Sequence, residues 1–167
     1  MDCVYHTDCP LGRILLSGRG DALTGLWLEG QQHYAAGLTG GEEERYLPVF
    51  GQTEAWLEGY FRGERPKKRP PLVPRGTPFQ RRVWGILLTI PWGGSMTYGE
   101  IARRLSEQGC RASARAAGGA VGRNPISILI PCHRVLGAGG RLTGYAGGLE
   151  RKRYLLSLEG IPWREEY

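Results

Sequence analysis

A cluster of prolines and basic residues near the middle of the chain limits the fold more than any other feature of the sequence. Four prolines fall within residues 62–76, and proline can neither continue a helix nor donate a hydrogen bond to a sheet. Segments of this composition are typical of linkers. The sequence therefore predicts two domains, an N-terminal one over residues 1–75 and a C-terminal one over residues 76–167.

The two predicted domains differ in charge. Residues 1–75 hold 9 Lys+Arg and 10 Asp+Glu, for a net charge of −1, whereas residues 76–167 hold 13 and 6, for a net charge of +7. Basic charge that is confined to one half of a chain indicates a polyanionic partner such as nucleic acid.

The chain lacks the signals of membrane and secreted proteins. No apolar run approaches the roughly 18 residues that a membrane-spanning helix needs, and residues 1–10 do not have the basic and then apolar stretches of a secretory signal. The cysteines show no framework spacing of a disulfide-rich domain. We therefore expect an intracellular protein with reduced thiols and no membrane partner. The cysteines are Cys3, Cys9, Cys110 and Cys132.

The N-terminal part has the pattern of a small sheet and one helix. Apolar runs over residues 11–17 and 23–28 flank the turn residues 18–21, which predicts a β-hairpin. Residues 37–45 are polar and glycine-rich, and we expect a solvated loop there. Residues 53–61 carry the apolar stripe of an amphipathic helix. That stripe consists of Trp56, Leu57, Tyr60 and Phe61.

The C-terminal part begins with helix signals. Thr77 followed by proline predicts a helix start, and Pro91 is expected to stop that helix. Thr97 and Glu100 have the spacing of a capping box for a second helix, and a third helix is expected over residues 112–123. The first helix should bury Phe79, Val83, Trp84, Leu87 and Leu88, and the second Ile101 and Leu105. Two short helices joined by a tight turn at 107–110 predict a helix-turn-helix.

A last helix is expected over residues 149–158. Its apolar side chains, Tyr154, Leu155 and Leu158, should face inward, and its basic side chains, Arg151, Lys152 and Arg153, should face outward.

The third helix has unusually small side chains. Gly118 and Gly119 each cost up to about 1 kcal/mol in a helix interior relative to alanine. Close packing against another helix is one explanation. The other is insertion into the DNA minor groove, which is only about 6 Å wide. Arg115 is the only long side chain from residue 112 to residue 122, so it is either a solvated surface arginine or a probe into the duplex.

Residues 126–130 form a nearly continuous apolar run, for which we expect a buried strand or extended segment. It leads into the sequence Pro-Cys-His-Arg-Val. An isolated Cys-His pair is weak evidence, because neighbouring residues on a strand point to opposite faces. The surrounding sequence is more specific, since Asn124 precedes the run and a glycine-rich loop follows at residues 144–148.

In these motifs the chain resembles the O6-alkylguanine-DNA alkyltransferases, also called methylated-DNA–protein-cysteine methyltransferases. The resemblance is strong over residues 76–160 and general over residues 1–75. Its matching segments are 76–80, 97–102, 115–118, 124–125, 131–135, 144–148 and 158–160.

The resemblance implies a set of roles. Cys132 would take the alkyl group from the O6 position of guanine, without a cofactor, because the damaged base is itself the donor. His133 would help to ionise the thiol through a water molecule, and Glu159 would orient the imidazole. Asn124 would brace the turn around the thiol, and Tyr98 would donate a proton to the departing guanine.

The resemblance also implies how DNA is bound. A base must leave the duplex to reach a buried thiol, and Arg115 would fill the space that it vacates. The partner would be double-stranded DNA containing O6-alkylguanine, with O4-alkylthymine as a second candidate. Other residues would lie against the DNA backbone: Ala112, Ala114, Ala117 and Gly118. Arg123, next to Asn124, is an extra positive charge and a further candidate for DNA binding. The pocket for the base would be formed by Tyr145, Ala146, Gly147, Val135 and Val121.

Some members of the family hold a structural zinc. The candidate ligands here are Cys3, His6, Cys9 and His33, which lack paired Cys-x-x-Cys spacing, so no metal site is predicted. We expect a monomer, located in the cytoplasm of a prokaryote or in the nucleus of a eukaryote. The fold class expected is α/β in the α+β sense: a small antiparallel-sheet domain, then a mostly helical domain with a helix-turn-helix and the active-site cysteine.

Three other functions compete with this interpretation. A non-catalytic relative that only binds damaged DNA would lack the acceptor thiol, whereas Cys132 is present. A helix-turn-helix regulator would explain the basic half of the chain but neither the motif at residues 131–135 nor Glu159. A cysteine hydrolase would need an oxyanion hole, and nothing else in the chain favours one.

Overall fold

The computed structural model describes residues 1–65 and 68–165, which form two compact units. The first unit contains the chain up to Arg75 together with Pro125–Leu129, and the second contains Gly76–Asn124 and the chain from Ile130 onward. The chain thus returns to the first unit for five residues, which lie between Asn124 and the Pro-Cys-His-Arg motif. None of the helices in the described part is long and apolar enough to span a membrane.

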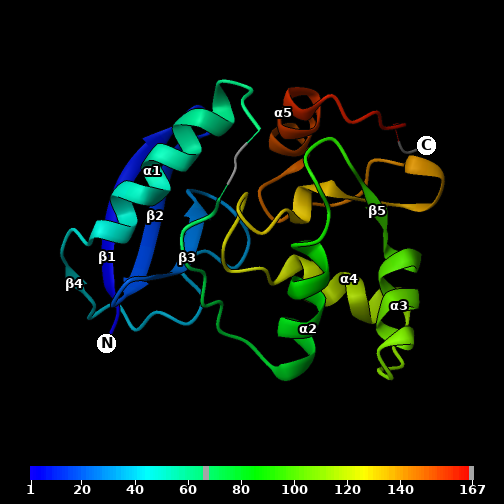
Figure 1. Ribbon diagram of the computed structural model, residues 1–167, viewed down its shortest axis with the longest axis horizontal. Helices are drawn as coiled ribbons and strands as arrows, with labels where there is room; N and C mark the ends of the chain where they lie inside the picture. Colours follow the sequence, from blue (N-terminus) through cyan, green and yellow to red (C-terminus); the bar gives the residue numbers. More distant parts are fainter. Residues whose placement is uncertain (66–67, 166–167) are drawn as a thin grey trace. The chain divides into compact units, whose positions relative to one another are not determined.

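The first unit is built on a four-stranded sheet in the order β3-β2-β1-β4 (Figure 1). The predicted hairpin is present as β2 (Gly12–Arg19) and β3 (Ala22–Leu28), which are antiparallel. Strand β1 (Cys3–Cys9) pairs antiparallel with β2 and was not predicted. The short strand β4 (Glu43–Glu44), parallel to β1, lies inside the segment that was expected to be a loop.

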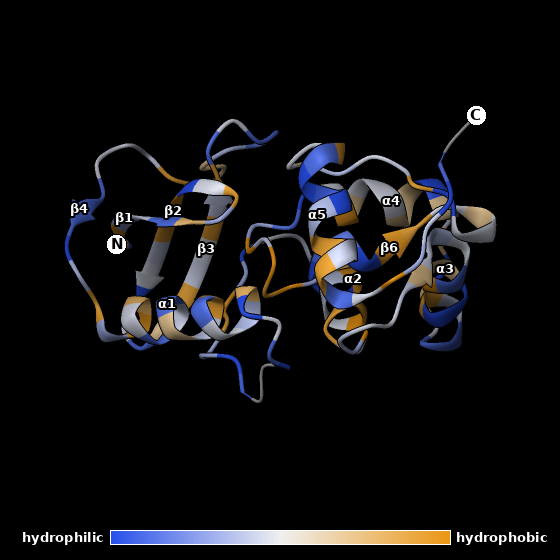
Figure 2. Ribbon diagram, turned by 90° about the horizontal axis from the view of Figure 1, so that it is seen from above, coloured by the Kyte–Doolittle hydropathy of each residue, from blue (hydrophilic) through white to orange (hydrophobic). Residues whose placement is uncertain are grey.

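One helix, α1 (Pro48–Phe61), lies across this sheet (Figure 1). It begins five residues before the predicted start, because Pro48 suits the first turn of a helix, where no backbone donor is needed. Its turns alternate between hydrophilic and hydrophobic residues (Figure 2). Of the predicted stripe, Leu57 and Tyr60 are buried, whereas Trp56 and Phe61 are only partly covered.

The proline-rich segment is only partly a linker. The Leu23 amide donates to the Pro71 carbonyl at 2.8 Å, and the Val73 amide donates to the Leu23 carbonyl at 2.9 Å. Residues 71–73 are therefore fastened to strand β3, because β3 has an edge that β2 does not cover. Pro66, which also supported the linker prediction, lies outside the described residues.

The second unit is mostly helical, and its helix starts agree with the sequence signals. Helix α2 (Pro78–Leu87) has a complete capping box of Thr77 and Gln80, and α3 (Tyr98–Glu107) has one of Thr97 and Glu100. Helix α4 (Ala114–Gly122) is capped by the Ser113 hydroxyl, which accepts from the Ala116 amide at 3.0 Å. Helix α5 spans Leu149–Glu159. The predicted core positions Val83, Trp84, Leu87, Ile101 and Leu105 are buried, whereas Phe79 and Leu88 are only partly so.

The prediction of a strand or extended segment at residues 126–130 was wrong, although the predicted burial is present. These residues are buried, but they form an irregular turn in which Ile128 adopts a positive φ of 71°. Ile126 makes a single bridge to Leu26 of β3, and the Leu26 amide donates to the Pro125 carbonyl at 2.9 Å. The continuous apolar pattern reflects burial on all sides, which a strand and a buried turn share.

A short 3-10 helix, η1 (Cys132–Arg134), carries the motif, and strand β6 (Val135–Leu136) follows it. Strand β6 pairs in parallel with β5 (Met96–Thr97), which leads directly into α3. The hydrophobic colour of β6 in Figure 2 matches its complete burial. A further 3-10 turn, η2, spans Ala138–Gly140.

The expected orientation of the last helix was partly wrong. Leu155 is buried as predicted, but Tyr154 is 44% exposed and Lys152 is fully buried. The interior face of α5 consists of Lys152, Leu155, Leu156 and Glu159. These positions follow the i, i+3, i+4, i+7 spacing of one helix face, so helix geometry, and not side-chain polarity, decides which residues are inside.

Candidate active site

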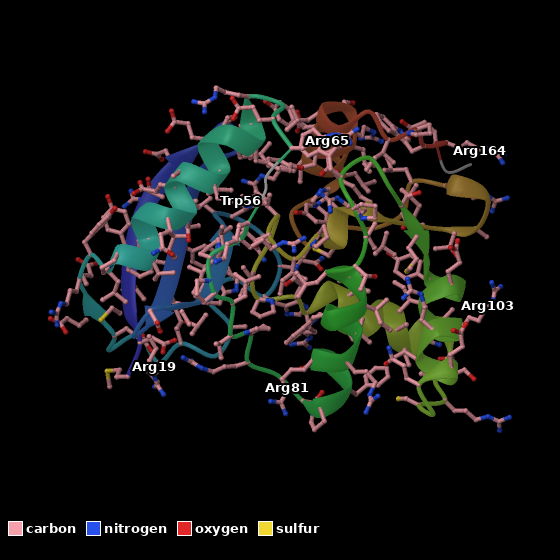
Figure 3. The ribbon with its side chains drawn as sticks, viewed as in Figure 1. Arg19, Trp56, Arg65, Arg81, Arg103 and Arg164 are labelled. Carbon is pink, nitrogen blue, oxygen red and sulfur yellow. The ribbon has the colours of Figure 1, made fainter. Side chains whose placement is uncertain are left out.

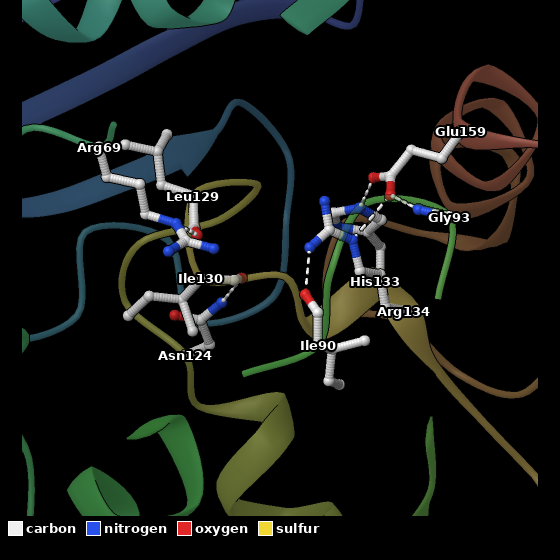
Figure 4. A network of polar contacts seen from close by, with 9 residues as sticks. All are labelled: Arg69, Ile90, Gly93, Asn124, Leu129, Ile130, His133, Arg134 and Glu159. Carbon is white, nitrogen blue, oxygen red and sulfur yellow. Dashed lines mark hydrogen bonds and ion pairs between the residues drawn. The ribbon is translucent and has the colours of Figure 1, made fainter. Parts of the chain in front are cut away.

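Cys132 lies at the start of η1, and only 5% of its surface is exposed. The Asn124 amide nitrogen Nδ2 lies 3.1 Å from Cys132 Sγ and donates to the Ile130 carbonyl at 2.8 Å. Asn124, which follows helix α4, thus holds both the thiol and the backbone that leads to it. The Asn124–Ile130 bond appears in Figure 4.

The environment of the thiol has opposing effects on its ionisation. Burial raises the pKa of Cys132, because a thiolate is poorly solvated in the interior. The Asn124 amide, the positive charge of Lys152 and the backbone amides of Cys132 and His133 act in the opposite direction. The site therefore contains groups that favour the thiolate, while the resting state is the protonated thiol.

His133 and Glu159 form a buried pair. His133 Nε2 lies 2.6 Å from Glu159 Oε2, and neither side chain is exposed to solvent. Burial lowers the pKa of His133, an effect that Glu159 opposes and that Arg134 and Lys152 reinforce. A neutral imidazole can accept a proton, so His133 has the protonation state that a general base requires.

The same carboxylate also binds an arginine that the sequence analysis did not single out. Arg134 Nε donates to Glu159 Oε1 at 2.7 Å, and Arg134 Nη1 donates to the Ile90 carbonyl at 2.6 Å. Figure 4 shows both contacts, together with the Gly93 amide, which donates to Glu159 Oε1 at 3.2 Å. Adjacent positions in the motif therefore both reach Glu159.

Lys152 is a second residue that sequence reasoning missed. Its ammonium group donates to the carbonyls of Val135, Thr143 and Gly144 at 2.6, 3.3 and 3.2 Å. Desolvation lowers the pKa of Lys152 to about 8, although the charge of Cys132 acts to raise it. The seven-residue spacing from Lys152 to Glu159, two helical turns, was the signal that could have placed it on the interior face.

Tyr98 begins α3, next to the β5–β6 pair. Its hydroxyl lies 3.2 Å from the Thr143 hydroxyl, and Thr143 precedes the glycine-rich loop. Burial raises the pKa of Tyr98, and so does the charge of Cys132. The phenol therefore keeps its proton and remains available as a donor.

The predicted pocket residues differ in exposure. Tyr145, Ala146 and Gly147 are partly exposed, whereas Val135 and Val121 are buried. The two valines pack in the interior, and the Val135 carbonyl accepts from Lys152. The role of all five in binding a base stays a prediction.

Helix α4 has a smooth, accessible face. Arg115 is exposed, and a Cβ atom added to Gly119 would meet nothing within 4 Å, so packing does not explain that glycine. A Cβ atom on Gly118 would touch the Tyr98 ring at 3.4 Å, an ordinary contact distance. Ala117, predicted to lie against DNA, is fully buried, because it is on the face of α4 that packs into the unit.

Exposed arginines are numerous on the second unit. Figure 3 shows Arg81 on α2 and Arg103 on α3 extending away from their helices. The other exposed arginines of this unit are Arg82, Arg111, Arg115, Arg123, Arg141 and Arg164. Within the described residues, no group of three or more His, Cys, Asp or Glu side chains could hold a metal ion.

The fold and the site together place one buried cysteine next to an asparagine amide, in a two-unit protein that also contains a buried His–Glu pair. Sequence models of the two domains of 6-O-methylguanine DNA methyltransferase match this chain. The ribonuclease-like domain matches residues 4–72, and the DNA binding domain matches residues 78–161. The chain belongs to this family.

Individual relatives agree with the assignment. A methylated-DNA–protein-cysteine methyltransferase of Haemophilus influenzae is 44% identical and covers 98% of this chain and 90% of its own. The Mycobacterium tuberculosis protein of that name is 46% identical, with 93% and 91% covered. A crystal structure of M. tuberculosis OGT in complex with DNA superposes with a TM-score of 0.83 at 44% identity, covering 94% of this chain and 92% of that one. These similarities extend over both units.

Proposed function

We propose that the protein repairs DNA by direct reversal of alkylation damage. The Cys132 thiolate attacks the alkyl carbon on O6 of guanine, the bond between that carbon and O6 breaks, and a thioether forms on the protein. The departing guanine takes up a proton and is thereby restored. The observation that carries this proposal is the Asn124–Cys132 contact at 3.1 Å beside the buried His133–Glu159 pair, in a member of this family.

Each residue of the site has a distinct part in this reaction. His133 accepts the thiol proton through a water molecule, and Glu159 keeps the imidazole oriented. Asn124 donates to the developing thiolate. Tyr98 donates its phenolic proton towards the departing guanine, which leaves poorly as an anion.

DNA binding is assigned to the helical unit. Helices α3 and α4 act as a helix-turn-helix, and the smooth face of α4 approaches the minor groove with backbone amides and small side chains. Arg115 occupies the space of the flipped-out base. The exposed arginines supply sequence-independent attraction to phosphate, which suits a monomeric protein that searches genomic DNA for lesions.

The test is a transfer assay with duplex DNA that carries a radiolabelled O6-methylguanine. Label should move to the protein, reach a plateau at one equivalent, and appear by mass spectrometry on the peptide that contains Cys132. Cys132→Ser should abolish transfer and retain binding to alkylated DNA, whereas the matched control Cys110→Ser should react normally.

The same assay separates the competing functions. A protein that only binds damage, or a regulator that binds DNA without reacting, would leave the label on the DNA. A hydrolase would turn over many times and leave Cys132 unmodified. Repeated turnover, or a methyl group on another cysteine, would contradict the proposal.

A further inference from the structure

Arg134 is a buried cation that the proposed reaction leaves without a role. Its side chain is 5% exposed and belongs to η1, one residue after His133. Its guanidinium connects Glu159 Oε1, at 2.7 Å, to the Ile90 carbonyl, at 2.6 Å (Figure 4). Placing an arginine in the interior has a high desolvation cost, which is offset only when its charge and its donors are matched.

The two oxygens of Glu159 contact different groups. Oε1 accepts from Arg134 Nε and from the Gly93 amide, and Oε2 faces His133 Nε2. A carboxylate can only accept hydrogen bonds, so in neutral His133 the proton lies on Nε2. Nδ1 is then the ring nitrogen that can accept a proton.

The charges around His133 explain why an arginine is needed there. The groups that act on the imidazole are Glu159 and Lys152 from α5 and Arg134 from its own segment, in which Cys132 is the preceding residue. A buried carboxylate by itself would stabilise a positively charged imidazole. A histidine that already holds a second proton cannot take one from a thiol. The Arg134 guanidinium, which pairs with Glu159 Oε1, already neutralises the carboxylate charge. The imidazole therefore does not need to take up a second proton to balance that charge.

We infer that Arg134 is a positioning residue that keeps His133 neutral, by pairing with Glu159, and thereby ready to accept the proton of Cys132. This inference rests on the proposed function in one respect only, the identity of the proton donor. The charge balance itself exists in the protein without DNA, and it can be measured there.

The first measurement is an NMR titration of the His133 ring in the protein without DNA, with the signal assigned by comparison with His133→Gln. In Arg134→Gln, which removes the charge, the titration midpoint of His133 should rise by about 1 to 3 pH units. Arg134→Lys keeps the charge and should keep the midpoint near that of the wild type. Arg153→Gln, which removes the exposed pair with Glu165, is the matched control and should change nothing.

The second measurement is the pH dependence of single-turnover transfer from saturating O6-methylguanine duplex. The acid limb should move to higher pH in Arg134→Gln by the same amount as the NMR midpoint, and it should stay in place in Arg134→Lys. An unchanged midpoint in Arg134→Gln would overturn the inference. If Arg134→Gln does not fold, a raised acid limb in Arg134→Lys would overturn it equally. If the His133 midpoints of the variants change as expected but the wild-type protein transfers no alkyl group, the proposed function is refuted and the role of Arg134 in the charge balance stands.

Discussion

Replacing Asn124 by alanine tests how the thiol is made reactive. The change removes the hydrogen bonds to the Ile130 carbonyl at 2.8 Å and to Cys132 Sγ at 3.1 Å. Ile130 is fully buried, and a buried carbonyl that loses its donor costs about 1–3 kcal/mol. A hydrogen bond to a charged group contributes about 1.5–3 kcal/mol, so the thiolate should become roughly 10- to 100-fold harder to form.

Two assays separate these effects. Urea unfolding measures the loss of stability, and the ultraviolet absorbance of the thiolate, read against Cys132→Ser, measures the pKa of Cys132. Asn124→Asp is the sharper variant because it keeps the side-chain size. It replaces the donor with a negative charge beside the sulfur, so its transfer rate at neutral pH should fall below that of Asn124→Ala. If Asn124→Ala loses stability while the thiol titrates as in the wild type, Asn124 only braces the turn.

Three further results are expected. The pKa of Lys152 in the folded protein is about 8, below its ordinary value of 10.5, so the folded state holds fewer protons than the unfolded state between these values. The free energy of unfolding should therefore rise with pH across that window by up to about 3 kcal/mol, and Lys152→Met should remove the rise. Urea unfolding measures this for proteins with and without Lys152→Met, both carrying Cys132→Ser so that the thiol cannot titrate. Arg115→Ala should slow repair of duplex DNA but not the reaction with free O6-benzylguanine, because a base must be unstacked, at a cost of a few kcal/mol, only in the duplex. If both reaction rates fall equally, Arg115 instead acts in the pocket that holds the base. Binding of undamaged duplex should weaken steeply with salt and show little sequence preference in fluorescence anisotropy, whereas strong preference for one sequence would favour a regulator.

Local signals predicted the helices of the second unit well. The capping boxes at Thr77 and Thr97 are present, and the residues expected to be inside these helices are largely buried. Strand β1 escaped prediction because its residues alternate only weakly between polar and apolar. This weak pattern accords with the burial of the strand, in which most side chains are only half-buried.

The site was predicted where a motif identified it and missed where it depended on buried charge. Cys132, His133, Asn124 and Glu159 come together as expected. Lys152 was placed outside, because a lysine in a helix is normally solvated. Only the three-dimensional structure shows that the carbonyls of Val135, Thr143 and Gly144 converge on it.

The burial of Cys132 also determines how long the protein lasts before it is used. An acceptor that reacts once must still carry an intact sulfur when a lesion is met. Oxidants and low-molecular-weight disulfides attack accessible thiolates, whereas Cys132 is 5% exposed and its burial raises its pKa. Cys3, Cys9 and Cys110 are more exposed. Under mild peroxide these three cysteines should oxidise before Cys132. Alkyl transfer should therefore persist after the more exposed thiols have stopped reacting with a thiol reagent.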